Sequence, residues 1–393
     1  MADPLAATLY AHPLLARVLP ALGEDTVMVV GGAVRDALLG VAPGDEVDLV
    51  VVGDAPALAR RLGRALGAPV DHFPRFGTAE VALPEGRVDL VGARRERYPH
   101  PGALPQVEPG TLADDLARRD FTVNAMALGL SGEGAGLLHD PHGGRVDLDA
   151  RLVRTLRPGS FAEDPSRLVR AARYVARLGL TLEAGTAAEA ALAAPALDLG
   201  SARVADELGR LLCEAVAGGA LSVLHRLGVP WVLPDAPARL EAVDRALAAR
   251  GAPDLAAWAA RLGAGVRAEA VGSSALPGWA REAALAVDAG WSAAPGLAPI
   301  GRLSEVDAAL GRTPAAFGVG ALAGGAAGVA RWWTDARDRR AAIDGDDLRA
   351  AGIAPGPAIG RGLLAARAAM LDGATPDAAG QLAVALAAAR GER

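Results

Sequence analysis

The sequence of 393 residues contains no lysine, so all 40 of its basic residues are arginines. A standard P-loop needs a Gly-Lys pair, and the absence of lysine therefore excludes this route to phosphate binding. Cysteine is almost absent as well. Because Cys213 is the only one, no intramolecular disulfide can form, which is consistent with a reducing cytoplasm. Cys213 lies in the apolar stretch LLCEAV, and we expect its side chain to belong to the core.

Aromatic residues and long apolar runs are also scarce. Six Trp, five Phe and three Tyr are present, so leucine, valine and alanine must supply most of the core. The long uncharged run at 313–330 is mostly alanine and glycine, and it is too weakly apolar for a transmembrane helix. The N-terminal segment lacks the basic region of a signal peptide. These features predict a soluble, cytoplasmic protein with no membrane partner.

The charge of the chain is acidic overall but basic in one segment. A formal net charge of −6 argues against a protein that coats nucleic acid without specificity. Residues 151–177 contain seven arginines and only two acidic residues, Glu163 and Asp164. Such a cluster can neutralise several phosphates, although a solvated helix face is the alternative. The arginines are Arg151, Arg154, Arg157, Arg167, Arg170, Arg173 and Arg177.

The most informative segment is 27–52, where a glycine turn joins an apolar strand to a helix. The β-branched run at 27–30 predicts a buried strand, and a helix follows at 33–39. Gly31 and Gly32 allow a sharp turn that exposes backbone amides at the helix start. Phosphates bind well there because the helix end is partly positive, and Arg35 adds a full charge. We expect these three residues to bind nucleotide phosphates.

The strand that follows carries two carboxylates, Glu46 and Asp48. Residues two apart in a strand point to the same face, so both side chains are expected to lie together. Carboxylates beside a phosphate site can hold a divalent cation, which bridges nucleotide phosphates and activates a hydroxyl. The segment therefore indicates nucleotidyl transfer.

Four further blocks follow this segment in a fixed order. They are RRDFTVNAMA at 118–127, DPHGGRVDL at 140–148, EDPSRLVRAARYVARLG at 163–179, and a weaker SARVADELGRLL at 201–212. Together with GGAVRDALLG and EVDLVV, they make the sequence from about Val27 to about Leu212 resemble the class II tRNA nucleotidyltransferases and bacterial poly(A) polymerases. This family belongs to the polymerase-β-like superfamily.

The resemblance implies that Glu46 and Asp48 bind Mg²⁺ and that Asp89, in the strand RVDLVGAR, is a third catalytic carboxylate. The family usually has Asp-x-Asp in the first block, whereas this chain has Glu46 with Asp45 just before it. Strand alternation places Glu46, and not Asp45, on the face of Asp48. For Asp89, a plain residue at a strand edge is the alternative.

The resemblance also assigns the nucleotide-binding residues. Those of the second block hold the triphosphate and ribose: Arg118, Arg119, Asp120 and Asn124. Those of the fourth block include the pair that reads the base edge of CTP and then ATP: Glu163, Asp164, Arg167 and Arg170. A structural salt bridge at a helix start is the alternative for the second block. For the fourth, Asp164 can simply cap the helix that begins at Pro165.

The chain divides by pattern into an α/β head and a helical remainder. Strands are expected at 27–30, 47–52, 78–83 and 87–92, and helices at 33–39, 55–66, 111–117, 165–178 and 201–215. Gly and Pro suggest breaks near 230–237, 271–278 and 291–300. We expect a polymerase-β-like head at 1–155, a helical neck with the base-selecting motif at 156–215, and a helical body and tail that bind tRNA at 216–393.

The implied reaction is template-independent addition of CCA, in whole or in part, to tRNA 3′ ends from CTP and ATP. Partial enzymes that add only CC or only A, and a poly(A) polymerase of the same fold, are alternatives. An inactive RNA-binding module is favoured by Glu46 alone. In the family, a flexible loop at Gly92 to Asp114 allows the switch to ATP and is shortened in CC-only enzymes. The segment looks full length here, which argues against CC-only addition but does not distinguish A-adding from CCA-adding enzymes. The sequence does not indicate the oligomeric state.

Overall fold

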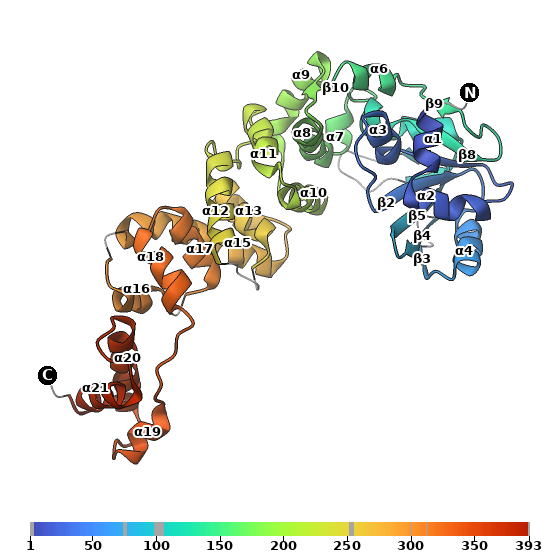
Figure 1. The fold of residues 1–393 in the computed structure, drawn as a ribbon. Helices are drawn as coiled ribbons and strands as arrows, with labels where there is room; N and C mark the ends of the chain where they lie inside the picture. Colours follow the sequence, from blue (N-terminus) through green and yellow to red (C-terminus); the bar gives the residue numbers. More distant parts are fainter. Residues whose placement is uncertain are drawn as a thin grey trace. The chain divides into compact units, whose positions relative to one another are not determined.

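The computed structural model describes residues 4–73, 77–97, 106–250, 255–298, 300–311 and 313–391. The chain forms two compact units, Met1–Leu197 and Asp198–Arg393 (Figure 1). The first unit combines a mixed sheet with helices, and the described part of the second unit is helical. This confirms the expected α/β head followed by helices. Residues 98–105 of the loop between Gly92 and Asp114 lie outside the described residues.

The head is built on a seven-stranded sheet. In spatial order its strands are β3 (Val70–Phe73), β4 (Thr78–Leu83), β5 (Gly86–Gly92), β2 (Glu46–Val51), β1 (Val27–Val30), β8 (Ala127–Ser131) and β9 (Leu138–His139). β2 and β5 are parallel, and the other neighbours are antiparallel. The strands expected at 27–30, 47–52, 78–83 and 87–92 are therefore present within one residue. The strands β3, β8 and β9 are not among those expected from the sequence pattern.

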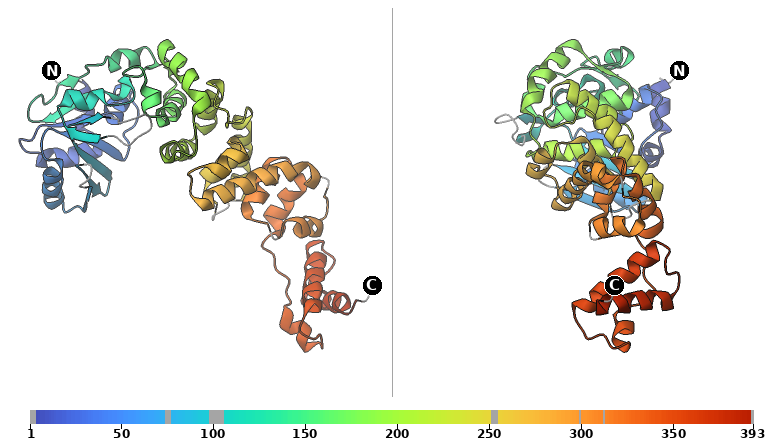
Figure 2. Two further views of the ribbon diagram at one scale, coloured as in Figure 1. Left: turned by 180° about the vertical axis from the view of Figure 1, so that it is seen from behind. Right: turned by 90° about the vertical axis from the view of Figure 1, so that its left-hand side faces the viewer.

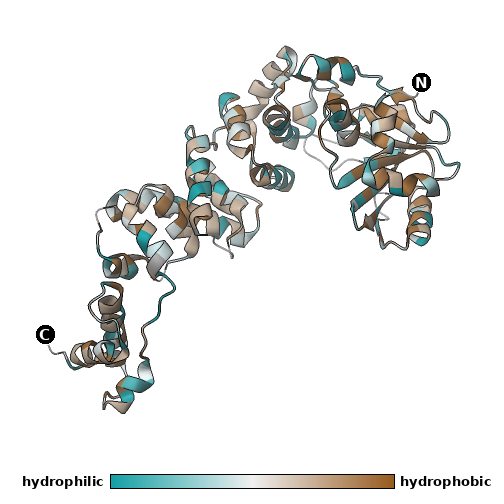
Figure 3. Cartoon of the chain, viewed as in Figure 1, coloured by the Kyte–Doolittle hydropathy of each residue, from teal (hydrophilic) through white to brown (hydrophobic). Residues whose placement is uncertain are grey.

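The two faces of β2 differ in character. Val47 and Leu49 are buried on one face, whereas Glu46 and Asp48 are exposed on the other. Val50, on the acidic face, packs against α5 (Leu112–Ala117) together with residues of β1 and β8. One end of this face is thus covered by a helix, and its acidic end remains accessible to solvent. Figure 3 shows how apolar residues concentrate along the strands of the head.

The remaining elements of the first unit precede, connect or follow the strands of the sheet along the chain. They are α1 (Pro4–Tyr10), α2 (Pro13–Val18), the 3₁₀ turn η1 (Leu19–Ala21), α3 (Gly32–Leu38), α4 (Ala55–Leu66), the hairpin β6 (Arg94–Arg97) and β7 (Gln106–Pro109), the 3₁₀ turn η3 (Thr122–Asn124), α6 (Gly144–Asp149), α7 (Ser160–Glu163), α8 (Ser166–Leu178), the pair β10 (Leu152–Val153) and β11 (Thr181–Leu182), α9 (Ala184–Ala193) and η4 (Ala194–Ala196). The helices expected at 33–39, 55–66, 111–117 and 165–178 correspond to α3, α4, α5 and α8.

The second unit is a succession of helices (Figure 2). They are α10 (Ala202–Cys213), α11 (Ala217–Arg226), α12 (Ala236–Arg250), α13 (Ala257–Gly265), α14 (Ala268–Ser273), α15 (Gly278–Leu297), α16 (Leu303–Leu310), α17 (Ala315–Ala323), α18 (Ala327–Arg331), the π-helical η5 (Trp332–Ala336), α19 (Gly345–Ala350), α20 (Pro357–Leu371) and α21 (Ala378–Arg390). No helix among the described residues is long and apolar enough to cross a bilayer.

Two details of this unit differ from expectation. Cys213 is exposed, because it is the last residue of α10 and falls outside the buried stripe that ends with Leu211 and Leu212. The break expected near 291–300 starts later, since α15 continues to Leu297. Pro295 lies in the last turn of that helix, where its missing N–H leaves the helix without one i→i−4 hydrogen bond.

Glycines allow α15 and α17 to pack with their backbones in direct contact. A Cβ atom built on Gly320 of α17 would collide with the carbonyl oxygen of Val287 in α15. Gly290 of α15 faces the carbonyl of Phe317 in the same way. Only a residue without a side chain fits at either position.

We therefore expect Gly320→Ala to lower the free energy of unfolding of the second unit by roughly 1–3 kcal/mol, the usual cost of overpacking. All six tryptophans lie in this unit, so urea titration followed by tryptophan fluorescence measures the change. The matched control is Gly360→Ala on the exposed surface of α20, where nothing lies within 4 Å of the new Cβ. That variant should be unchanged or slightly more stable, since alanine favours helix. Equal unfolding curves for the two variants would contradict this explanation of the close packing.

Candidate active site

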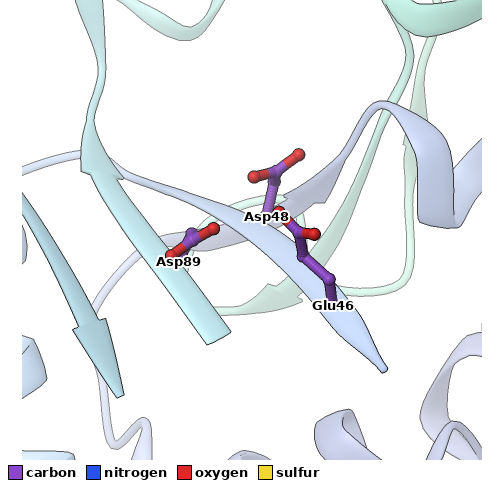
Figure 4. A group of neighbouring side chains, drawn as sticks. All are labelled: Glu46, Asp48 and Asp89. Atoms are coloured by element: carbon purple, nitrogen blue, oxygen red, sulfur yellow. The ribbon is translucent and has the colours of Figure 1, made fainter. Parts of the chain in front are cut away.

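Three carboxylates converge on the open face of β2 and β5 (Figure 4). The parallel register pairs Asp48 with Asp89, and alternation along β2 adds Glu46 to the same face. One oxygen from each side chain lies within 4.8 Å of those of the other two. Within the described ranges, this is the only group of three or more potential metal ligands that the structure brings together. Asp45 is not part of it.

The electrostatics of this carboxylate cluster favour a bound cation. Burial raises the pKa of Asp89 to about 6, and repulsion from Asp48 and Glu46 adds to the effect. The pKa of Asp48 is also raised, although its side chain is accessible to solvent, because packed protein replaces much of the surrounding water. The positive charge of Arg119 opposes that shift. Carboxylate oxygens in such a group fit a hard divalent cation, so these residues suit a metal site.

The glycine turn connects this cluster to the second block. Gly31 precedes α3 with a φ of +69°, a backbone conformation that residues other than glycine rarely adopt. A Cβ atom there would lie 2.8 Å from Nη1 of Arg119. Gly32, in the first turn of α3, would place a Cβ in ordinary contact with Arg35. The expected glycine turn is present, and its backbone lies directly beside an arginine of the second block.

Arg118 and Arg119 are held by a buried carboxylate that the sequence analysis does not identify. Asp115 is fully buried in α5, and its Oδ1 accepts hydrogen bonds from Nε and Nη2 of Arg118 at 2.9 and 2.7 Å. Its Oδ2 accepts one from Nη2 of Arg119 at 3.1 Å. Glu96, in β6, accepts a further bond from Nη1 of Arg118 at 3.0 Å. Helical spacing could have indicated Asp115, but no local pattern points to Glu96.

Asp120 and Asn124 form a chain of buried hydrogen bonds with two arginines. Oδ1 of Asp120 accepts from Nδ2 of Asn124 at 3.0 Å, and its Oδ2 accepts from Nε of Arg170 at 2.7 Å. Burial alone would raise the pKa of Asp120, but the charge of Arg170 and the bond from Asn124 outweigh it and keep the pKa low. Oδ1 of Asn124 in turn accepts from Nη1 of Arg35 at 2.5 Å.

Arg35 and Asn124 are held inside the first unit. Arg35 is 3% exposed and lies over the ring of Tyr174, in addition to its bond with Asn124. Asn124 does not follow Asp120 along an α-helix. The intervening segment is the short 3₁₀ turn η3, after which the chain enters β8.

The residues of the fourth block lie at the junction of α7 and α8. Arg167 is buried, with its Nη1 donating to Oγ of Ser160 at 2.8 Å and its Nη2 to the carbonyl of Arg118 at 3.3 Å. Oδ1 of Asp164 accepts from both the backbone and the hydroxyl of Ser166. Nε of Arg167 lies 4.0 Å from Oδ2 of Asp164. The two side chains are therefore neighbours. Asp164 also accepts a hydrogen bond from the amide of Ser166, the first residue of α8, although the N-cap position of that helix is Pro165.

The arginine-rich segment 151–177 is far less free than its composition suggests. Five of its arginines form ion pairs with carboxylates, and three of the five pair with carboxylates from outside the segment. The pairs are Arg154 with Asp147, Arg157 with Glu163, Arg167 with Glu163 and Asp164, Arg170 with Asp120, and Arg177 with Asp36. A count of charges within the segment does not include the partners that lie outside it. Because these arginines are paired, much of the positive charge of the segment stabilises the fold of the first unit.

Comparisons with known proteins agree with this arrangement. A family model described as the poly A polymerase head domain matches residues 27–154. A CC-adding tRNA nucleotidyltransferase of Deinococcus radiodurans is 44% identical over 270 residues, which cover 65% of this chain and 71% of that protein. An A-adding tRNA nucleotidyltransferase of Aquifex aeolicus is 46% identical over 186 residues, which cover 47% of this chain but only 22% of that protein.

Solved structures match over almost the whole chain. An apo form of a CCA-adding enzyme superposes with a TM-score of 0.81 at 26% identity, covering 98% of this chain and 99% of the other. A CCA-adding enzyme of Thermotoga maritima, complexed with tRNA, gives a TM-score of 0.75 at 25% identity and covers 98% of each chain. Because the sequence relationship extends over most of a known relative and the architecture agrees throughout, this chain belongs to the tRNA nucleotidyltransferase family.

Proposed function

We propose that this protein is a template-independent nucleotidyltransferase that completes the CCA end of tRNA from CTP and ATP. The observation that carries the proposal is the position of the family's arginines beside the carboxylate cluster. Arg118, Arg119 and Arg170 all lie close enough to Asp48 for their positive charges to oppose the rise in its pKa that burial causes, and Arg119 has the largest effect of the three. A triphosphate bound by these guanidiniums would have its reacting phosphorus near the carboxylates.

We assign the metal-binding role to Glu46 and Asp48, with Mg²⁺ as the cation. Bound there, Mg²⁺ supplies neutralisation of the triphosphate charge and activation of the attacking hydroxyl. The RNA 3′ oxygen forms a bond to the α-phosphorus, the bond to the bridging oxygen breaks, and pyrophosphate leaves. Asp89, which lies opposite Asp48 in the parallel register, is the carboxylate that we assign to accept the hydroxyl proton. Asp120 and Asn124 would orient the ribose.

Base selection requires Asp164 and Arg167 to exchange some of their present partners. The bonds of Arg167 to the carbonyl of Arg118 and to Glu163 are long, at 3.3 and 3.4 Å. Long hydrogen bonds are weak, so these are the contacts that a base edge can replace at least cost. The shorter bond to Ser160 would keep the guanidinium plane in position.

Arg167→Ala should therefore reduce discrimination of CTP and ATP against UTP and GTP by about 1–3 kcal/mol, the value of a bidentate base contact. Relative kcat/KM values for the four nucleotides measure the effect. The matched control is Arg177→Ala on the same helix, where the arginine is exposed and pairs with Asp36. A slower enzyme with unchanged nucleotide preference would count against the base-reading role.

The reaction itself is tested with three tRNA substrates, which end before the CCA sequence, after C, or after CC. Each is incubated with labelled CTP or ATP, and the products are resolved by length. Addition of C, C and then A supports the proposal. A long A tail would indicate a poly(A) polymerase, A addition restricted to CC ends would indicate an A-adding enzyme, and no transfer would overturn the assignment.

A second candidate is CC addition alone. It is favoured by the relative from Deinococcus radiodurans, which is named a CC-adding tRNA nucleotidyltransferase and is covered by this chain over 71% of its length. In the same experiment a CC-adding enzyme would stop after two C residues and leave a CC-ended tRNA unchanged in the presence of ATP.

A further inference from the structure

A fourth charged side chain shares the face of the carboxylate cluster. Arg87 lies two residues before Asp89 on β5, and the parallel register places it directly opposite Glu46. Its Nη2 is 2.7 Å from Oε2 of Glu46, and its Nε is 3.8 Å from Oδ2 of Asp89. The guanidinium therefore lies among the carboxylates that the proposed function assigns to catalysis and metal binding. It reduces the formal charge of the cluster from −3 to −2.

The contact between Arg87 and Glu46 is suited to reversible pairing. Both side chains are 49% exposed, so water remains available to each charge when the pair separates. Ion pairs at such exposure contribute about 0–1 kcal/mol, which a divalent cation binding to the same carboxylate can readily exceed. A structural ion pair buried in the core could not be displaced so easily.

We propose that Arg87 is a built-in counter-ion, which holds the Glu46 carboxylate when no metal is bound and lowers the affinity of the cluster for a divalent cation. The inference rests on the metal site of the proposed function. A cation that binds Glu46 must displace the guanidinium, whose positive charge then remains within a few ångströms. Both effects weaken metal binding, and both depend on the positive charge of residue 87.

The test is binding of Mn²⁺ to the full-length protein, with free Mn²⁺ measured by electron paramagnetic resonance at pH 8, above the pKa of Asp89 of about 6. Arg87→Gln should bind Mn²⁺ about three- to ten-fold more tightly than the wild type, given the energies of exposed charge pairs. The matched control is Arg61→Gln, which removes the same charge from α4. Arg61 pairs with Asp25, just before β1, at the opposite end of the sheet from Glu46. The Arg61→Gln variant should bind Mn²⁺ with the affinity of the wild type.

A double-substitution cycle tests whether Arg87 acts through Glu46. In a Glu46→Gln background, Arg87→Gln should change Mn²⁺ affinity by clearly less than in the wild type, because the displaced partner is gone. Unchanged or weaker binding by the single variant Arg87→Gln overturns the inference while the metal site stands. If Asp48→Asn binds Mn²⁺ as well as the wild type does, the ion does not occupy the cluster, and both the metal site and the role of Arg87 are overturned.

Discussion

Asp48→Ala is expected to abolish nucleotide addition, lowering the rate by roughly 10³-fold or more, because loss of metal-based charge stabilisation costs several kcal/mol. Asp48 occupies the middle of the cluster, between Glu46 on its own strand and Asp89 on the next. It is also the carboxylate on which the arginines of the second and fourth blocks act. Incorporation of labelled CTP into tRNA, at saturating nucleotide, measures the loss.

The matched control is Asp45→Ala, which removes an exposed carboxylate three positions before Asp48 that does not belong to the cluster. Asp45 contributes its backbone carbonyl to the amide of Arg87, and this contact survives the substitution. We expect Asp45→Ala to retain most activity and both variants to bind tRNA with the wild-type affinity. Normal turnover by Asp48→Ala would place the metal elsewhere.

The parts of the site that local sequence encodes are those that could be predicted. Glu46 and Asp48 share a face because strand geometry alternates, and Gly31 marks a turn because its positive φ excludes other residues. Asp89 could be added because a strand pattern surrounds it. That Asp48 and Asp89 are adjacent in a parallel register follows from the tertiary fold, and only the family resemblance anticipated it.

The contacts that were missed join residues far apart in the chain. Arg177 reaches Asp36 across 141 positions and Arg170 reaches Asp120 across 50, so no window of sequence reveals either ion pair. The strand β8 was missed for a related reason. Its sequence ALGLS has no strong strand propensity, and it adopts strand structure because it pairs with β1 on one side and β9 on the other.

Asp115 is the missed residue with the largest expected effect on stability. Its carboxylate is completely buried and is the shared acceptor for two guanidiniums, which are themselves mostly buried. Removing one partner of a buried ion pair leaves an uncompensated charge, which typically costs about 3–5 kcal/mol. Asp115→Asn keeps the size of the side chain, but it replaces one acceptor oxygen by an amide that can only donate toward an arginine.

We therefore expect Asp115→Asn to unfold at lower urea concentration, as measured by circular dichroism, with a loss of about 3–5 kcal/mol in the free energy of unfolding. Below its unfolding transition, the variant should show a larger increase in KM for CTP than decrease in kcat, because Arg118 and Arg119 would lose their orientation before the carboxylate cluster is disturbed. Asp114→Asn is the matched control: this partly exposed neighbour belongs to the capping box of the same helix and contacts Arg95, so the change should be much smaller. Equal stabilities and equal KM values for the two variants would show that Asp115 does not position the arginines. A variant that loses stability but keeps the wild-type KM would limit Asp115 to a structural role. The shift in KM is the result that separates positioning of the triphosphate from simple support of α5.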